Sequence, residues 1–197
     1  MREFLQKIAS SPPLEARWLN TLSLLEFVGA RKISRTVCQK HPSLDVLHHF
    51  ADETRHAYTF KNLRLQLSGG TFNNYLCRDE ALGYFQTLDR DLSRWMTTVT
   101  KKDNSYQNYL AVTCAIERRA MKLYPLYRSV TKDPRVREEL GRVIEEEASH
   151  KGPIEENLNT LLREHDLSFD PCLKKEGELF ENFASILNRH TSSEERS

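Results

Sequence analysis

The chain has 197 residues and a net charge of +1, and its 39% hydrophobic and 29% charged residues are typical of one folded domain with a substantial core. Lysine and arginine are scattered along it, so bulk charge gives no indication of a nucleic-acid or membrane-surface partner. No apolar run approaches the roughly 20 residues needed to cross a bilayer. The N-terminal residues lack the apolar core of a signal peptide, which predicts a cytoplasmic protein.

The first part of the chain predicts two long helices after a short N-terminal segment. The segment before Pro12 is long enough for one helix. Apolar positions then recur at steps of three and four over residues 14–39 and again over residues 44–67, which is the pattern of amphipathic helices. Ser43 is placed to cap the second of these helices and Gly69 to end it.

A long connection of about 35 residues separates these helices from two more. Within it we expect a helix near residues 79–99. The third and fourth long helices are predicted over residues 105–130 and 134–164. Pro125 and Pro153 fall inside them, and each predicts a kink.

The end of the chain predicts a shorter closing helix over residues 173–190 and a disordered polar tail over residues 191–197. We therefore expect a single helical domain over residues 1–190. Short loops make each pair of long helices antiparallel, and the long connection lets the pairs pack in a crossed-over order. The predicted fold class is all-α: a four-helix bundle with a long crossover connection between helices two and three and an additional C-terminal helix.

Two long stretches each contain a single acidic residue within an apolar helical pattern. Glu26 is the only carboxylate in residues 16–44, and Glu117 is the only one in residues 104–132. A carboxylate on a buried helix face is costly unless it is paired, protonated or bound to a metal. Both glutamates therefore require a compensating charge.

Each lone glutamate is followed, about one helix later, by a Glu-x-x-His motif: Glu53 with His56, and Glu147 with His150. Residues three apart share a helix face, so each pair can reach one point. Glu117 follows Glu26 by 91 residues and Glu147 follows Glu53 by 94, so the two halves have nearly the same spacing. The motif alone is common by chance, and this shared register is what predicts a metal site.

Four carboxylates and two imidazoles suit iron, manganese or zinc better than copper(I) or an iron–sulfur cluster. Four negative charges also balance two divalent cations rather than one. The alternative is a helical bundle whose buried acids are paired with arginines in salt bridges.

This set resembles the ferritin-like di-iron carboxylate superfamily, which includes rubrerythrins and p-aminobenzoate N-oxygenases, over about residues 14–165. In that superfamily two helices each supply a Glu and two others each supply a Glu-x-x-His. The resemblance implies that the metal ligands are Glu26, Glu53, His56, Glu117, Glu147 and His150. It also implies two iron ions as cofactor, with a manganese–iron or manganese pair as alternatives.

Four neighbouring residues each allow two interpretations. Asp52 and Glu146 precede ligand glutamates and either support the opposite histidine or remain solvated. His49 lies one turn before Glu53 and is either an extra ligand or a core histidine with ordinary partners. Tyr124 is either a redox-active or pocket-lining phenol, or core packing.

The resemblance implies a non-haem di-iron oxidoreductase that activates dioxygen to oxidise or oxygenate a small organic substrate, with an external electron donor and a possible homodimer. No nucleic-acid or membrane partner is expected. One alternative is a rubrerythrin-like peroxidase or ferritin-like iron oxidase, although the four isolated cysteines provide no rubredoxin module. A second alternative is a non-enzymatic helical interaction module. An open pocket framed by aromatic residues would favour the organic substrate; the candidates are Phe27, Phe50, Tyr84, Phe85 and Tyr124.

Overall fold

The structure is a computed structural model that describes residues 1–37, 41–69 and 74–194, and the side chains of all but the last two of these. Within these ranges the regular structure is entirely helical, which confirms the all-α prediction. No helix in these ranges has the length and apolarity that crossing a bilayer requires. The helices are α1 (Arg2–Ala9), α2 (Pro12–Thr36), α3 (Leu44–Ser68), α4 (Arg78–Thr100), α5 (Ser105–Val130), α6 (Pro134–Arg163) and α7 (Asp170–Glu194).

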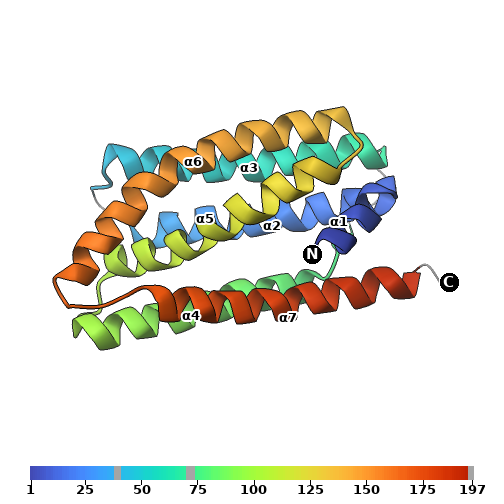
Figure 1. Ribbon diagram of the computed structural model, residues 1–197. Coiled ribbons are helices and arrows are strands. Elements are labelled where there is room, and N and C mark those ends of the chain that lie inside the picture. Colours follow the sequence, from blue (N-terminus) through green and yellow to red (C-terminus); the bar gives the residue numbers. More distant parts are fainter. Residues whose placement is uncertain (38–40, 70–73, 195–197) are drawn as a thin grey trace.

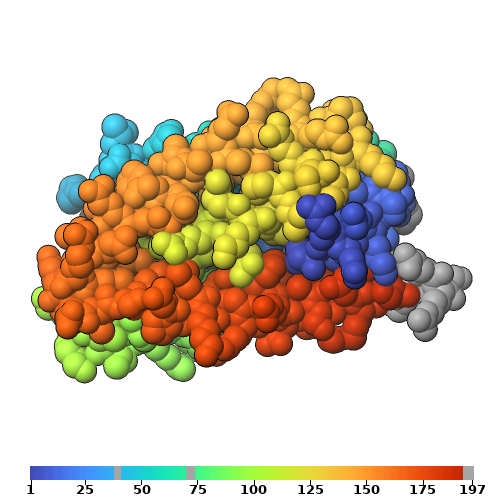
Figure 2. All heavy atoms as spheres, viewed as in Figure 1, coloured from blue at the N-terminus to red at the C-terminus, as the bar shows by residue number. Residues whose placement is uncertain are grey.

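Four long helices form the centre of the molecule (Figure 1). Helix α2 packs along α3 and α5 packs along α6, while further contacts join α3 to α6 and α2 to α5. The connection between the two pairs contains α4, which lies beside α7 along one side of the bundle. In the space-filling view α1, α5, α6 and α7 cover the bundle on the side that faces the reader (Figure 2).

The predicted helix boundaries are largely confirmed. The Ser43 side chain accepts a hydrogen bond from the backbone N–H of Val46, and Gly69 ends α3 in the left-handed region with φ of 59°. Helix α4 forms where the long connection was expected to contain one. Asp133 caps α6 by accepting from two backbone N–H groups.

The short helix expected before Pro12 is present as α1, and Pro12 and Pro13 form the first turn of α2, where the missing N–H costs nothing. Two expectations for the end of the chain need correction. Helix α7 is long, not short, and continues to Glu194. The prediction of a disordered tail from residue 191 is therefore wrong for residues 191–194. Thr191 is fully buried and donates a hydrogen bond to the Leu187 carbonyl. Residues 195–197 of that tail, like residues 38 and 39 of the helix predicted over residues 14–39, lie outside the described residues.

The two internal prolines are accommodated within continuous helices. Helix α5 runs through Pro125 to its end at Val130. Helix α6 runs through Pro153 and bends in its second half, as Figure 1 shows. A bend at this point follows from the lost backbone donor of proline.

The buried apolar side chains form two clusters along the bundle. One includes Trp18, Leu22 and Phe60, and the other includes Ile33 and Val46. Along α2 and α3 the glutamates predicted to bind metal lie between members of one cluster and members of the other. The described part of the core is therefore divided by a polar layer.

The cysteines have the structural role expected of them, as far as they are described. Cys114 and Cys172 are buried free thiols, and burial raises their pKa to about 11 and about 12. Both are therefore protonated and unreactive at neutral pH. Cys38 lies outside the described residues.

Glu15 is a buried acid at the end of the bundle away from the polar layer. Its Oε1 accepts hydrogen bonds from Tyr127 Oη at 3.0 Å and Thr131 Oγ1 at 2.6 Å. Burial raises the pKa of Glu15, although these two hydrogen bonds oppose that rise. The protonated side chain therefore stabilises the fold fully below the unfolded-state pKa, and this contribution is lost as pH rises through the raised pKa.

We predict that Glu15→Gln becomes more stable relative to wild type as pH rises from 4 to 8, because an amide oxygen keeps both hydrogen bonds without a buried charge. Urea unfolding across this pH range measures the difference in the free energy of unfolding. Glu178→Gln, on the exposed face of α7, is the matched control. A difference that does not change with pH would contradict the assignment.

Candidate metal centre

The six predicted ligands meet in the polar layer, although they come from four helices. Each is at most 8% exposed. Helix α2 contributes Glu26, α3 contributes Glu53 and His56, α5 contributes Glu117, and α6 contributes Glu147 and His150. The spacing of these residues in the sequence thus correctly predicted that they lie at the same level along the bundle.

The ligand atoms fall into two adjoining groups. In one, the donor atoms of Glu26, His56 and Glu147 lie within 4.8 Å of one another. In the other, those of Glu117, His150 and His49 do so. Two such groups, each with both carboxylate and imidazole donors, match the chemistry of a divalent transition metal.

Glu53 lies beside both groups. Its Oε1 is 3.1 Å from His49 Nε2. Its Oε2 occupies space that a side chain at position 29 would need, because a Cβ added to Gly29 would lie 2.6 Å from it. The sequence pattern treated Gly29 only as a position on the apolar stripe, and nothing in the spacing indicated this close approach.

The buried acids are poorly compensated by the protein itself. Both oxygens of Glu117 are buried without a hydrogen-bond partner. Burial and the charges of Glu147 and Glu53 raise the pKa of Glu117 to about 10. Burial, followed by the charges of Glu26 and Glu147, also raises the pKa of Glu53 well above its ordinary value. Bound cations would remove this mutual repulsion.

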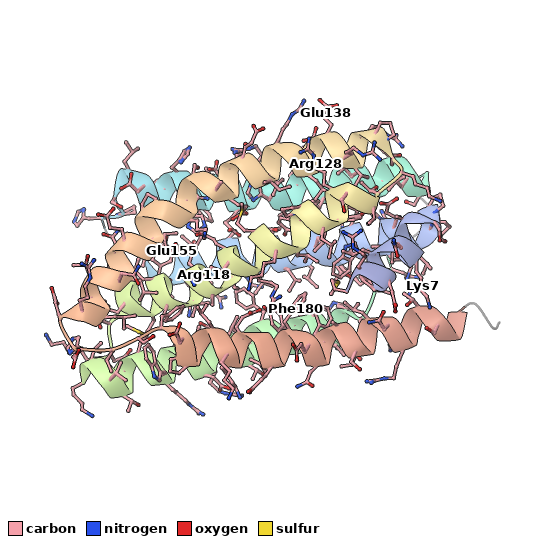
Figure 3. The ribbon with its side chains drawn as sticks, in the orientation of Figure 1. Lys7, Arg118, Arg128, Glu138, Glu155 and Phe180 are labelled. Carbon is pink, nitrogen blue, oxygen red and sulfur yellow. The ribbon has the colours of Figure 1, made fainter. Side chains whose placement is uncertain are left out.

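The neighbouring arginines do not supply that compensation. Arg118 donates to Glu155 at 2.6 Å, and Figure 3 shows the pair bridging α5 and α6. Arg119 forms two hydrogen bonds with Glu176. Within the described ranges, no lysine or arginine forms an ion pair with any of the four ligand glutamates. This weakens the salt-bridge interpretation of the cluster.

Asp52 and Glu146 make the cross-helix contacts expected of supporting acids. Glu146 Oε2 lies 2.7 Å from His56 Nε2, and Asp52 Oδ2 lies 2.7 Å from His150 Nε2. Arg55 bridges the two acids, at 2.6 Å from Asp52 and 2.9 Å from Glu146. Burial would raise the pKa of both acids, but hydrogen bonds from the histidines and Arg55 lower it, so both remain carboxylates.

These contacts fix which nitrogen of each histidine faces the cluster. Because Nε2 of His56 and of His150 is held by a carboxylate, Nδ1 of each ring points to the ligand groups. His150 Nδ1 is buried without a hydrogen-bond partner. His56 Nδ1 lies 3.1 Å from Glu147 Oε1, outside hydrogen-bond geometry. Burial lowers the pKa of His56, but the carboxylates of Glu147 and Glu26 raise it to about 11.

The contacts of His49 fit both an extra metal ligand and a core histidine with ordinary hydrogen-bond partners. Its Nδ1 lies 2.8 Å from the Tyr109 hydroxyl, and its Nε2 lies 3.1 Å from Glu53 and 3.6 Å from Glu117. Burial lowers the pKa of His49 to about 4, which keeps the ring neutral and able to bind a metal. Tyr109 was not singled out in the sequence, because nothing in its spacing distinguishes it from other helix aromatics.

A third group, formed by exposed His48 with Asp52 and His150, also brings donor atoms together. It is not independent of the other two, since it uses the same Asp52 Oδ2 and His150 Nε2 atoms that already bond to each other. We therefore assign the centre to the two buried groups.

An apolar cavity of about 70 Å³ lies beside Glu26 and Glu53. Three of the five candidate aromatic residues, Tyr84, Phe85 and Tyr124, line it, and the Tyr124 hydroxyl donates to Glu26. Phe180 of α7 lies between α7 and α5, with the Arg119 guanidinium 4.0 Å from its ring centre (Figure 3). The cavity is thus closed on one side by α7.

Two aromatic residues were wrongly placed in this wall. Phe27 is 49% exposed on the outer face of α2, because consecutive helix residues point about 100° apart and Glu26 takes the inward direction. Phe50 packs against the second apolar cluster instead of lining the cavity.

Comparison of the chain with protein-family models, curated proteins and solved structures returned no match. The centre must therefore be interpreted from its own geometry.

We predict that Gly29→Ala weakens divalent-metal binding by about tenfold to a hundredfold, because the new methyl group displaces the Glu53 carboxylate. The increase in Tm with added Mn²⁺ measures the effect. Gly83→Ala is the matched control, as nothing lies within 4 Å of a Cβ added there. Equal metal-induced increases in wild type and Gly29→Ala would show that Glu53 is not held in place by this contact.

Proposed function

We propose that this chain is a non-haem di-iron oxidoreductase with a ferritin-like bundle, in which α2, α3, α5 and α6 hold the metals and α4 forms the crossover. One observation carries the proposal: four glutamates and two histidines from four helices meet in a buried layer without a balancing lysine or arginine. A non-enzymatic helical module has no need of this arrangement, since replacing a whole cluster of buried charges with well-packed apolar residues is often neutral or stabilising.

Iron is the first candidate metal, with manganese in one or both positions as the alternative. Carboxylate-rich sites with imidazole ligands suit these ions. The metal ligands are Glu26, Glu53, His56, Glu117, Glu147 and His150. His49 is either a seventh ligand or a hydrogen-bond donor that orients Glu53.

A pair of ferrous ions bound by these residues would supply electrons to dioxygen. The protein residues hold this chemistry in place. Asp52 and Glu146 fix the ring orientation of the two histidines. The hydroxyl of Tyr124 orients one oxygen of Glu26. The wall of the cavity beside Glu26 and Glu53 is mostly apolar, which favours the approach of an apolar substrate from this side.

We further propose that the substrate is a small organic molecule that reaches the centre through this cavity. The observation in favour is that Glu26 and Glu53 open directly onto an apolar space lined by aromatic side chains. The second candidate is a peroxidase or ferrous-iron oxidase. It is favoured by the cavity volume of about 70 Å³, which is room for about two water-sized molecules at roughly 30 Å³ each.

The test is a single-turnover reaction of the full chain loaded anaerobically with ferrous iron. We predict that adding dioxygen oxidises the bound iron faster than free ferrous iron in the same buffer. Glu117→Gln should lose this reaction, because the amide cannot replace an anionic ligand. Glu156→Gln, exposed on the same helix as Glu147, should retain it.

Equal rates for wild-type protein, Glu117→Gln and free iron would rule out a dioxygen-activating centre. A rate with hydrogen peroxide that exceeds the rate with dioxygen would favour the peroxidase instead.

A further inference from the structure

A surface groove of about 600 Å³ runs between α2 and α4, near the metal centre. Its apolar part includes Phe27, Leu82 and Phe85. Pockets of this volume are typical of sites for small molecules. The exposed ring of Phe27, which has no role in the cavity wall, belongs to this groove.

The charged part of the groove is strongly basic, although the whole chain has a net charge of only +1. One acid, Asp89, lines it and accepts a hydrogen bond from Lys32. Four cationic side chains line it: Arg31, Lys32, Arg35 and Arg78. Lys32 is paired with Asp89 and Arg78 with Asp79, so the positive charge offered to an anion comes from the part of the groove that Arg31 lines.

Arg31 is positioned to bind such an anion. It follows Phe27 by one helical turn, and its guanidinium lies 5.8 Å from the centre of the Phe27 ring. Within the part of the chain that the structure describes, no carboxylate pairs with Arg31. A guanidinium that pairs with no carboxylate of the described residues can bind the carboxylate or phosphate of a ligand through two parallel hydrogen bonds.

Phe85 connects the groove to the metal centre. Its side chain lines the basic groove and also lines the internal cavity beside Glu26 and Glu53. Phe85 is only 6% exposed, so its ring is almost fully enclosed where it contacts both spaces.

We propose that the groove binds an amphiphilic organic anion and that Phe85 admits the apolar end of this molecule to the cavity beside Glu26 and Glu53. The anionic head, a carboxylate or a phosphate, binds near Arg31. The inference rests on the proposed function for the identity of the reaction, but the binding itself does not require metal. The substrate class is therefore a small apolar or aromatic body with one anionic group.

The first test is calorimetric titration of the full chain, as purified, with octanoate, octyl phosphate and octanol. We predict that at least one of the two anions binds and that octanol binds at least tenfold more weakly. Comparing octanoate with octyl phosphate identifies the preferred head group. Arg31→Gln should weaken anion binding by about tenfold, since it removes a charge-assisted contact, whereas Arg94→Gln, exposed on α4 and outside the groove, should not.

The second test locates the apolar end. Trp18 lines the internal cavity, and in a Trp95→Phe background it is the only tryptophan of the chain. We predict that 8-bromooctanoate quenches Trp18 fluorescence more strongly than 2-bromooctanoate, whose bromine lies beside the carboxylate.

Equal binding of octanoate, octyl phosphate and octanol, unchanged anion affinity in Arg31→Gln, or equal quenching by the two bromo acids would each overturn the proposal. Neither measurement depends on iron. Anion binding without oxygen chemistry would therefore contradict the proposed function alone, and oxygen chemistry without anion binding would contradict this inference alone.

Discussion

Repulsion among four buried glutamates is the constraint on which the rest of this structure depends. Each carboxylate is held in the middle of a helix, where burial costs several kcal/mol per ion unless the charge is balanced. His56, whose pKa is raised to about 11, balances only part of it, and both oxygens of Glu117 remain without a hydrogen-bond partner. The surrounding apolar clusters, Asp52 and Glu146 therefore hold together carboxyl groups that cannot all ionise unless a compensating cation is bound.

A network of Asp52, Glu146 and Arg55 surrounds the two histidines of the candidate centre and holds them in position. Arg55 joins Asp52 to Glu146, and each acid holds the histidine of the opposite helix. Helices α3 and α6 are thus tied together at the same height as the ligands. The cavity lies beside Glu26 and Glu53 and is lined by neither Asp52 nor Glu146, so the supporting network leaves this space open to a molecule that the proposed function requires.

Much of this arrangement could be predicted from sequence because helix periodicity determines which residues share a face. The spacing of Glu26 and Glu117 relative to the two Glu-x-x-His motifs placed all six predicted ligands in one layer, and the structure brings these side chains together there. The contacts of Asp52 and Glu146 followed from the same register. Helix boundaries were found wherever a cap residue, such as Ser43 or Asp133, marked them.

The remaining features depend on contacts between helices, which periodicity does not encode. The close approach of Gly29 to Glu53 arises from the packing of α2 against α3. The joint position of Phe85 between groove and cavity depends on how α4 lies on the bundle.

The metal content of the full chain, measured after anaerobic reconstitution with ferrous iron and removal of unbound metal, tests the central claim most directly. The account predicts about two irons per chain, and a chain that retains no iron would contradict it.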